Sequence, residues 1–178
     1  MSKVLVLVEG VTEKGAVSAI AKKLKVQVRT ALMNGNNPEK LRGFIRTTKY
    51  DKFIVLKDLK PYGEENIRRK FNDIRRNLRA DIRDRIKLAI AKQTTEAWFL
   101  ADPEALERTF NCKIETAIEN PEDIQDPVEE LDKLLRKCGK RYIKGEQVAK
   151  KIIEELNLEK ATRKLDSLKI FLKNIQDP

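Results

Sequence analysis

A near-continuous run of branched apolar residues near the N-terminus constrains the fold more than any other feature. The run KVLVLVEG, residues 3–10, ends at an acid followed by a glycine. A strand with one side in water alternates apolar and polar residues, so an unbroken run is typical of a strand covered on both faces. Thr12 can then cap a helix whose apolar residues recur at helical spacing from Val17 to Leu24. The run therefore predicts the first strand and helix of a parallel sheet.

Strand and helix patterns continue to alternate over residues 1–119. Strands that alternate with helices form parallel sheets with helices on both faces, so we predict an α/β domain with a mostly parallel, four-stranded sheet. After residue 120 the pattern is purely helical, which predicts a helical C-terminal extension, 120–178, packed on that domain. The expected strands span 3–10, 26–37, 52–58 and 85–91, and further helices are expected from Pro38, over 64–82 and over 94–110, with a new turn from Asp102 and Pro103.

The composition excludes several kinds of chemistry. The chain holds no histidine, which rules out serine–histidine and cysteine–histidine catalysis and any imidazole metal site. Cys112 and Cys138 are too few and too widely spaced for a zinc site or a disulfide framework. The apolar run at the N-terminus is too short for a signal peptide, and no stretch approaches membrane-spanning length. We therefore expect a cytoplasmic protein without a membrane role, with chemistry based on carboxylates, lysines, hydroxyls and a hard metal ion.

The charge balance favours a polyanion as partner or substrate. Lysine and arginine outnumber aspartate and glutamate by 38 to 28, a net charge of +10, and nucleic acid is the first polyanion to consider. From Arg68 to Lys87, nine basic residues stand against three acids. This local excess suits phosphate binding, but it has no interleaved aromatic residues of the kind that single-strand binders use, and taken alone it is better explained as a solvated helix face. The many lysines, arginines and glutamates would also suit a thermophile.

Three acids follow the expected strands. Glu9 comes after the first strand, Asp58 ends the third, and Glu96 follows the fourth. The carboxyl ends of parallel strands meet at one edge of the sheet, where ligands bind. Carboxylates that converge there repel one another unless a cation compensates them, and a site of carboxylates without histidine suits Mg²⁺ or Mn²⁺. Such an ion stabilises the charge that develops in phosphoryl transfer.

Each of these acids also has a structural interpretation. Glu9 and Asp58 can cap the helices that follow them, and Glu96 in a first helical turn favours the helix dipole. Asp102, before Pro103, is expected to be an N-cap. Trp98 and Phe99 are expected in the core.

Several motifs carry a resemblance to a known family. They are, in chain order, VEGVTE with Glu9, IVLKDL with Asp58, the block TEAWFLADPEAL with Trp98, and the tail segments NPEDIQD and YIKG. Together they resemble toprim domains, the topoisomerase–primase fold. The likeness is closer to a smaller, largely uncharacterised toprim-like family related to the nucleases named for the overcoming-lysogenization-defect phenotype, and it spans most of the chain.

The resemblance implies roles for the acids. In toprim enzymes the glutamate after the first strand acts in proton transfer or metal chemistry, which makes Glu9 the candidate general acid or base and a metal-site residue. An Asp-x-Asp pair after a later strand binds Mg²⁺, which makes Asp58 the candidate ligand. The second aspartate of that pair would fall at position 60, where this chain has Lys60. Glu96 is the candidate for the missing oxygen ligand.

The leading hypothesis is a Mg²⁺- or Mn²⁺-dependent, toprim-type protein that acts on nucleic-acid phosphodiesters as a nuclease, with Glu9, Asp58 and Glu96 in its site. Alternatively, the chain is a nucleic-acid-binding or accessory protein that kept the fold and lost catalysis, as Lys60 suggests. A third possibility is a metal-dependent enzyme acting on small phosphorylated molecules, since a fold does not set the substrate. The expected phosphate contacts are Lys14, Lys57, Lys60, Arg68, Arg69 and Arg76.

Overall fold

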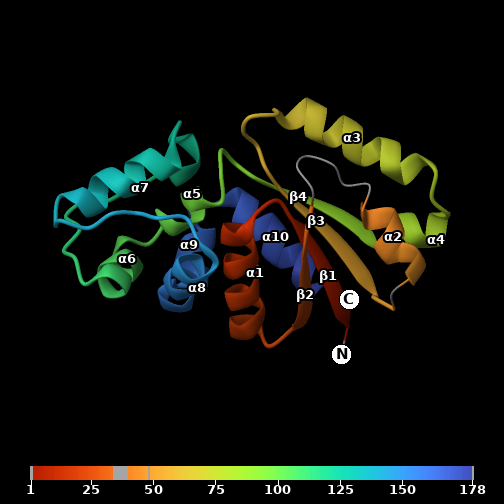
Figure 1. Ribbon diagram of the computed structural model, residues 1–178, viewed down its shortest axis with the longest axis horizontal. Helices are drawn as coiled ribbons and strands as arrows, with labels where there is room; N and C mark the ends of the chain where they lie inside the picture. Colours follow the sequence, from red (N-terminus) through yellow and green to blue (C-terminus); the bar gives the residue numbers. More distant parts are fainter. Residues whose placement is uncertain (1, 34–39, 48, 178) are drawn as a thin grey trace.

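Four parallel strands form a single sheet in the computed structural model, which describes residues 2–33, 40–47 and 49–177 (Figure 1). The strand order is β2-β1-β3-β4, so β1 and β3 are central and the other two lie at the edges. All three strand pairs are parallel. The predicted four-stranded parallel sheet is therefore confirmed. The strands are β1 (Lys3–Val8), β2 (Gln27–Leu32), β3 (Lys52–Asp58) and β4 (Ile86–Ala91).

Helices flank the sheet and make up the C-terminal part of the chain. The expected helix start at Pro38 lies outside the described residues, which resume at Lys40. The helices are α1 (Val11–Leu24), α2 (Lys40–Thr47), α3 (Glu64–Arg76), α4 (Ala80–Arg83), α5 (Glu96–Phe99), α6 (Pro103–Phe110), the 3-10 turn η1 (Pro121–Asp123), α7 (Pro127–Arg136), α8 (Glu146–Glu155), α9 (Leu158–Thr162) and α10 (Asp166–Gln176).

The sheet is buried on both faces, as the apolar run of β1 predicts. Val4, Val6 and Val8 belong to one core cluster, while Leu5 and Leu7 belong to a second cluster on the other side. Successive side chains of a strand point to opposite faces, so both faces need apolar residues. The first cluster includes residues of α1 and α10, and the second includes residues of α2 and α3.

The helices that follow β4 lie largely beyond the carboxyl ends of the strands, where Figure 1 shows α5 to α9 gathered on one side. α8 packs along α1, and the approach is so close that a Cβ on Gly15 would lie 2.1 Å from the Glu146 carbonyl oxygen. α10 runs back against β3 and β4. The Trp98 indole N–H donates to Ser167 Oγ over 2.8 Å, and its ring lies 5.5 Å from the Phe171 ring. The helical part thus shares one core with the sheet.

Two expected helices are each divided in the structure. The segment 64–82 forms α3 and the short α4, although its apolar stripe still packs on the second core cluster. The segment 94–110 forms α5 and α6, and α6 begins at the expected turn with Asp102 as its N-cap residue, because Asp102, in front of Pro103, has φ −131° and ψ 87°. Proline disfavours helical geometry in the residue before it. The N-cap of α1 is Gly10 and not Thr12, which lies inside the helix.

The expectation about the cysteines is wrong in one respect. Cys112 and Cys138 form a disulfide, with their Cα atoms 5.9 Å apart. The bridge joins the segment after α6 to the C-terminal end of α7, and the separation of 26 residues in sequence gave no indication of this proximity. Among the described residues, no helix is both long and apolar enough to cross a membrane.

Candidate active site

Asp58 is the centre of the acidic residues at the carboxyl edge of the sheet. It ends β3, and one of its oxygens accepts two hydrogen bonds, from the backbone N–H and the hydroxyl of Thr95, each at 2.9 Å. Thr95 follows β4, so these bonds fix the Asp58 side chain across two strands. The Asp58 backbone N–H donates to Glu9 Oε2 over 3.3 Å. Asp58 and Glu9, both expected at this edge, are therefore in contact.

Glu13 also belongs to this cluster, and the sequence argument missed it. Burial raises the pKa of Asp58 well above its usual range, and the nearby carboxylates of Glu13 and then Glu96 raise it further. Glu13 is itself buried, in the first turn of α1. A Cβ on Gly10 would lie 3.0 Å from Glu13 Oε2, so the glycine leaves room for this carboxylate. The feature of the sequence that could have identified Glu13 is its position four residues after Glu9.

Glu96 is held in the cluster by the helical part of the chain. Its side chain is only 1% exposed. Oε1 accepts a hydrogen bond from the Tyr142 hydroxyl over 3.2 Å and lies 3.3 Å from Lys144 Nζ. Oε2 is buried and accepts no hydrogen bond from a described residue. Burial, and then the charge of Glu96, raises the pKa of Tyr142, so the phenol remains a neutral donor to Glu96.

Glu9 has a cation of its own. Lys57, which is 2% exposed, forms an ion pair with Glu9 Oε1. Burial lowers the pKa of Lys57 to about 8, while the charge of Asp58 opposes that shift. Lys57 Nζ also lies 4.8 Å from the centre of the Tyr62 ring. Lys57 thus compensates Glu9, as Lys144 compensates Glu96, while Asp58 lies among carboxylates, with Glu13 and Glu96 raising its pKa.

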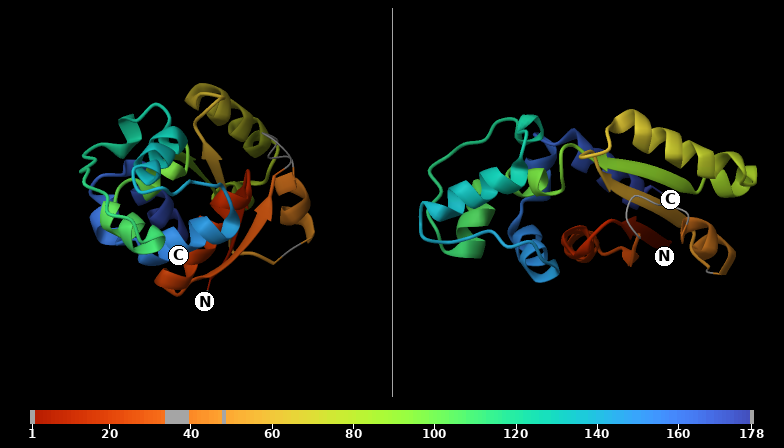
Figure 2. Two further views of the ribbon diagram at one scale, coloured as in Figure 1. Left: turned by 60° about the vertical axis from the view of Figure 1, so that its left-hand side comes forward. Right: turned by 45° about the horizontal axis from the view of Figure 1, so that its top comes forward.

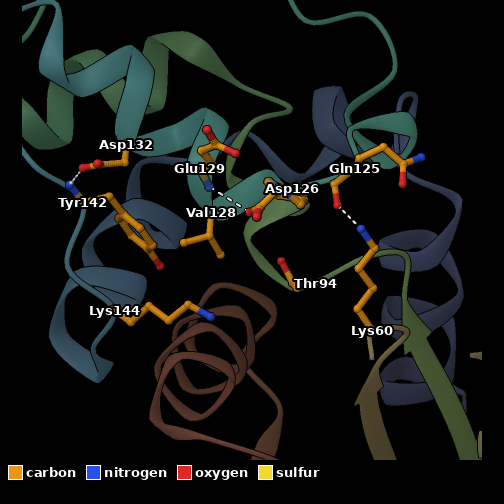
Figure 3. A pocket seen from close by; sticks show the side chains of 10 residues that line it. Lys60, Thr94, Gln125, Asp126, Val128, Glu129, Asp132, Tyr142 and Lys144 are labelled. Carbon is orange, nitrogen blue, oxygen red and sulfur yellow. Dashed lines mark hydrogen bonds between the residues drawn. The ribbon is translucent and has the colours of Figure 1, made fainter. Parts of the chain in front are cut away.

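A cavity of about 460 Å³ opens beside these carboxylates, between the sheet edge and α7 (Figure 3). Lys60 and Lys144 extend toward it from two sides. Thr94, which precedes the residue that holds Asp58, also lines it, and so does Tyr142. The cavity therefore lies next to the acidic cluster and has cations at its wall. Its other lining residues are Gln125, Asp126, Pro127, Val128, Glu129 and Asp132.

The carboxylates of the cluster suit a metal ion by their chemistry but not by their present arrangement, and Lys60 supplies no ligand. Three buried carboxylates, one with an oxygen lacking a hydrogen-bond partner, suit a hard divalent cation chemically. Within the described ranges, however, no group of three or more His, Cys, Asp or Glu side chains is arranged to hold an ion. The Lys60 amine donates to the Gln125 carbonyl and so turns toward the helical part. A bound ion would require the carboxylates to draw closer together.

The other expected phosphate contacts are spread over two places. Lys14 lies on α1 and pairs with Glu146 at 2.9 Å, near the carboxylate cluster. Arg68, Arg69 and Arg76 lie on α3, away from it. Arg68 pairs with Glu64 at 2.7 Å and Arg76 with Asp73 at 3.4 Å. The structure thus brings the lysines to the site and leaves the three arginines on a neighbouring surface.

Comparison with known proteins identifies the family of the chain. A family model described as a domain of unknown function, DUF4276, matches residues 8–176. The match covers nearly the whole chain, so the chain belongs to this family. No curated protein and no solved structure matches it. Because the family description names no activity, the functional argument rests on the geometry of the site.

Proposed function

We propose that the protein is a Mg²⁺- or Mn²⁺-dependent enzyme of the toprim type that processes nucleic-acid phosphodiesters, in its simplest form a nuclease. The observation that carries the proposal is the buried cluster of Glu13, Asp58 and Glu96 at the carboxyl edge of a parallel sheet. Burial and the neighbouring carboxylates raise the pKa of Asp58, an arrangement that is costly to folding and that is concentrated at functional sites. The net charge of +10 supports a polyanionic substrate.

The proposed metal ligands are Glu13, Asp58 and Glu96, with Glu9 next to them. When bound, a divalent ion would stabilise negative charge on the phosphodiester and lower the pKa of a bound water. Thr95 keeps Asp58 oriented through its two hydrogen bonds. Glu9, ionised beside Lys57, can accept a proton from the attacking group.

The lysines have two proposed roles. Lys57 is buried and paired, so it orients Glu9 and does not meet the substrate. Lys60 and Lys144 border the cavity and can contact a phosphate there. Lys144 also compensates Glu96 in the absence of a metal ion, and it becomes available to a phosphate when a divalent ion takes over that role. Lys14 lies on the α1 side of the same site.

The alternative is a nucleic-acid-binding or accessory protein of the toprim type without catalysis. Lys60 in place of a second aspartate favours this alternative, because a cation at that position supplies no oxygen ligand. A cavity of about 460 Å³ would also accept a small phosphorylated molecule, the third candidate function.

A cytoplasmic location is part of the proposal. Among cytoplasmic proteins, disulfides are most common in those of hyperthermophiles, which agrees with the many charged residues of this chain.

Calorimetric titration of Mg²⁺ and Mn²⁺ tests the metal site. We expect binding in the wild type, and its loss in Asp58→Asn and in Glu13→Gln. Both replacements keep the shape of the side chain, and an asparagine oxygen can still accept the Thr95 hydrogen bonds. Glu119→Gln, an exposed acid outside the cluster, is the matched control and should bind as the wild type does.

Cleavage assays on single- and double-stranded DNA and RNA then distinguish the candidate functions. Metal-dependent cleavage that is lost in Asp58→Asn supports the nuclease. Oligonucleotide binding without metal binding or cleavage supports the accessory protein. Metal binding without any affinity for an oligonucleotide would contradict both and favour a small phosphorylated substrate.

A further inference from the structure

Cavities lie beside the outer strand β4, where the Leu88 carbonyl accepts a hydrogen bond from the Asn174 side chain over 3.3 Å. β4 is an edge strand, with α3 on one face of the sheet and α10 on the other. Two cavities, of about 250 and 130 Å³, lie along it. Figure 2 (right) shows β4 running beside α3 at the margin of the sheet. We call these two cavities together the β4-edge groove.

The two cavities of the β4-edge groove are adjacent, and the second extends toward the carboxylate cluster. Its two cavities share Arg68 and Leu88 in their walls. The second cavity extends to Leu59 and Lys92, at the carboxyl ends of β3 and β4. Next along the chain, the Lys60 backbone N–H donates to the Gln93 carbonyl over 3.1 Å, and Lys60 lines the cavity beside Asp58. The groove therefore ends where the candidate active site begins.

The groove carries more positive than negative charge. Arg68, Arg75, Lys87 and Lys92 line it, against the two acids Glu64 and Asp166. Some of these cations already have partners: Arg68 pairs with Glu64, Lys92 lies 3.8 Å from Glu122, and Arg75 donates to the Arg83 carbonyl over 3.3 Å. The surplus of cations suits a chain of phosphates.

Apolar side chains lie between these cations. Leu88 and Ile90 of β4 line the floor, and Ile170 of α10 lines one wall although its side chain is 53% exposed. A single nucleic-acid strand presents this combination of charged backbone and flat bases, and strand-binding grooves contact both, commonly with aromatic side chains. In this groove the contact with bases would come from Leu88, Ile90 and Ile170. The bases of a duplex are stacked inside, so these apolar side chains could not contact them face on.

We propose that the β4-edge groove binds one unpaired strand of nucleic acid and directs it to the carboxylate cluster. This inference rests on the proposed function and adds to it the strandedness of the substrate and its path. Lys87 lies where the strand enters, and Lys92 lies near Lys60 at the site. Lys87 is on β4 and Lys92 directly follows it, five residues on or roughly 16 Å in extended chain, which leaves room for more than one phosphate contact.

Fluorescence anisotropy with a labelled single-stranded 12-mer and its duplex tests the proposal, with EDTA present so that nothing is cleaved. In Lys87→Gln/Lys92→Gln, affinity for the single strand should fall at least tenfold. The dependence of log K on log salt should become shallower by about 1.4, since each lost phosphate contact to a single strand contributes roughly 0.7. The control Lys150→Gln/Lys151→Gln removes the same charge from α8 and should change affinity less than twofold.

The outcomes separate this inference from the proposed function. If the wild type binds the single strand and the groove variant binds it as well as the α8 control does, the inference is overturned, while the proposed function stands. Tighter binding of the duplex than of the single strand would also overturn the inference. If the wild type binds no oligonucleotide, both proposals fail together. Unchanged thermal unfolding of both double variants verifies that they are folded.

Discussion

Glu96 and Asp102 are two acids six residues apart in one short block, and both are about 1% exposed. Asp102 accepts a hydrogen bond from the Asn157 backbone N–H over 3.1 Å and lies 3.6 Å from Lys160 Nζ. It therefore joins the start of α6 to the start of α9. Glu96 instead lies close enough to Asp58 to raise the pKa of that carboxyl. The two acids are equally buried but have different roles. Asp102 joins two helices, whereas Glu96 belongs to a cluster of mutually repelling carboxylates.

The largest difference between the two acids should appear in catalysis. We expect Glu96→Gln to lower metal-dependent cleavage by roughly a thousandfold, about 4 kcal/mol in activation free energy. Asp102→Asn should leave the rate within about threefold. Rates measured at saturating metal and oligonucleotide for both variants test this difference. Equal losses in the two variants would mean that Glu96 acts only through the fold.

Removing the disulfide should affect stability and leave the carboxylate cluster intact. The bridge closes a loop of 26 residues in the segment that follows α6, so its loss should cost about 3 kcal/mol through the entropy of the unfolded chain. Urea unfolding of Cys112→Ser/Cys138→Ser beside the oxidised wild type measures this cost. Divalent metal affinity should remain the same. A change in metal affinity would show that the bridge also positions the site.

Asp102→Ala should lower the free energy of unfolding by about 2 kcal/mol. The change removes the ion pair with Lys160 and leaves the Asn157 N–H without its acceptor, whereas no capping hydrogen bond of α6 is lost. Glu96→Gln should instead raise stability, because it takes one negative charge out of the cluster. Thermal unfolding in metal-free buffer compares the two. A destabilised Glu96→Gln would contradict the view that the cluster is strained.

Tyr142→Phe should cost about 1 kcal/mol, the usual net value of one hydrogen bond, because it removes the donor to Glu96. The cost should shrink when Glu96 is already glutamine, since a neutral amide needs the phenol less than a carboxylate does. A double-mutant cycle on unfolding free energies measures this coupling. An unchanged cost in both backgrounds would show that Tyr142 contributes only packing.

The smallest expected effect is a change in the free energy of unfolding with pH. Because the pKa of Asp58 is raised in the folded protein from its ordinary 3.8, the folded state holds its proton to higher pH than the unfolded chain does. Stability from this group should therefore fall as pH rises from about 4 through the raised pKa. Asp58→Asn should remove that part of the slope, and Mg²⁺ should reduce it by favouring the carboxylate. Urea unfolding between pH 4 and 8 measures both.

The elements of the sheet could be predicted closely from the sequence. KVLVLV and KFIVLKD predicted buried parallel strands because burial on both faces requires an unbroken apolar run. The helices were harder to delimit, because capping and the geometry before Pro103 decide where a helix ends. The expected core positions of Trp98 and Phe99 are confirmed.

The candidate site was predictable only in part. Glu9, Asp58 and Glu96 lie at one edge of the sheet because each follows or ends a parallel strand, and this placement was predictable. Their roles remain predictions. Which carboxylates face one another could not be read from position. Lys57 forms an ion pair with Glu9, while Glu13 lies close enough to Asp58 to raise its pKa.

By itself, the sequence determined a parallel sheet with acids at its carboxyl edge, because hydrophobic periodicity and the alternation of strands and helices can be read along the chain. Only the tertiary structure decided which charges are compensated and which are not. Lys57 and Glu9 are separated by 48 residues and Tyr142 and Glu96 by 46. Electrostatic energy depends on the distance and burial of two groups in space, and neither follows from their separation along the chain.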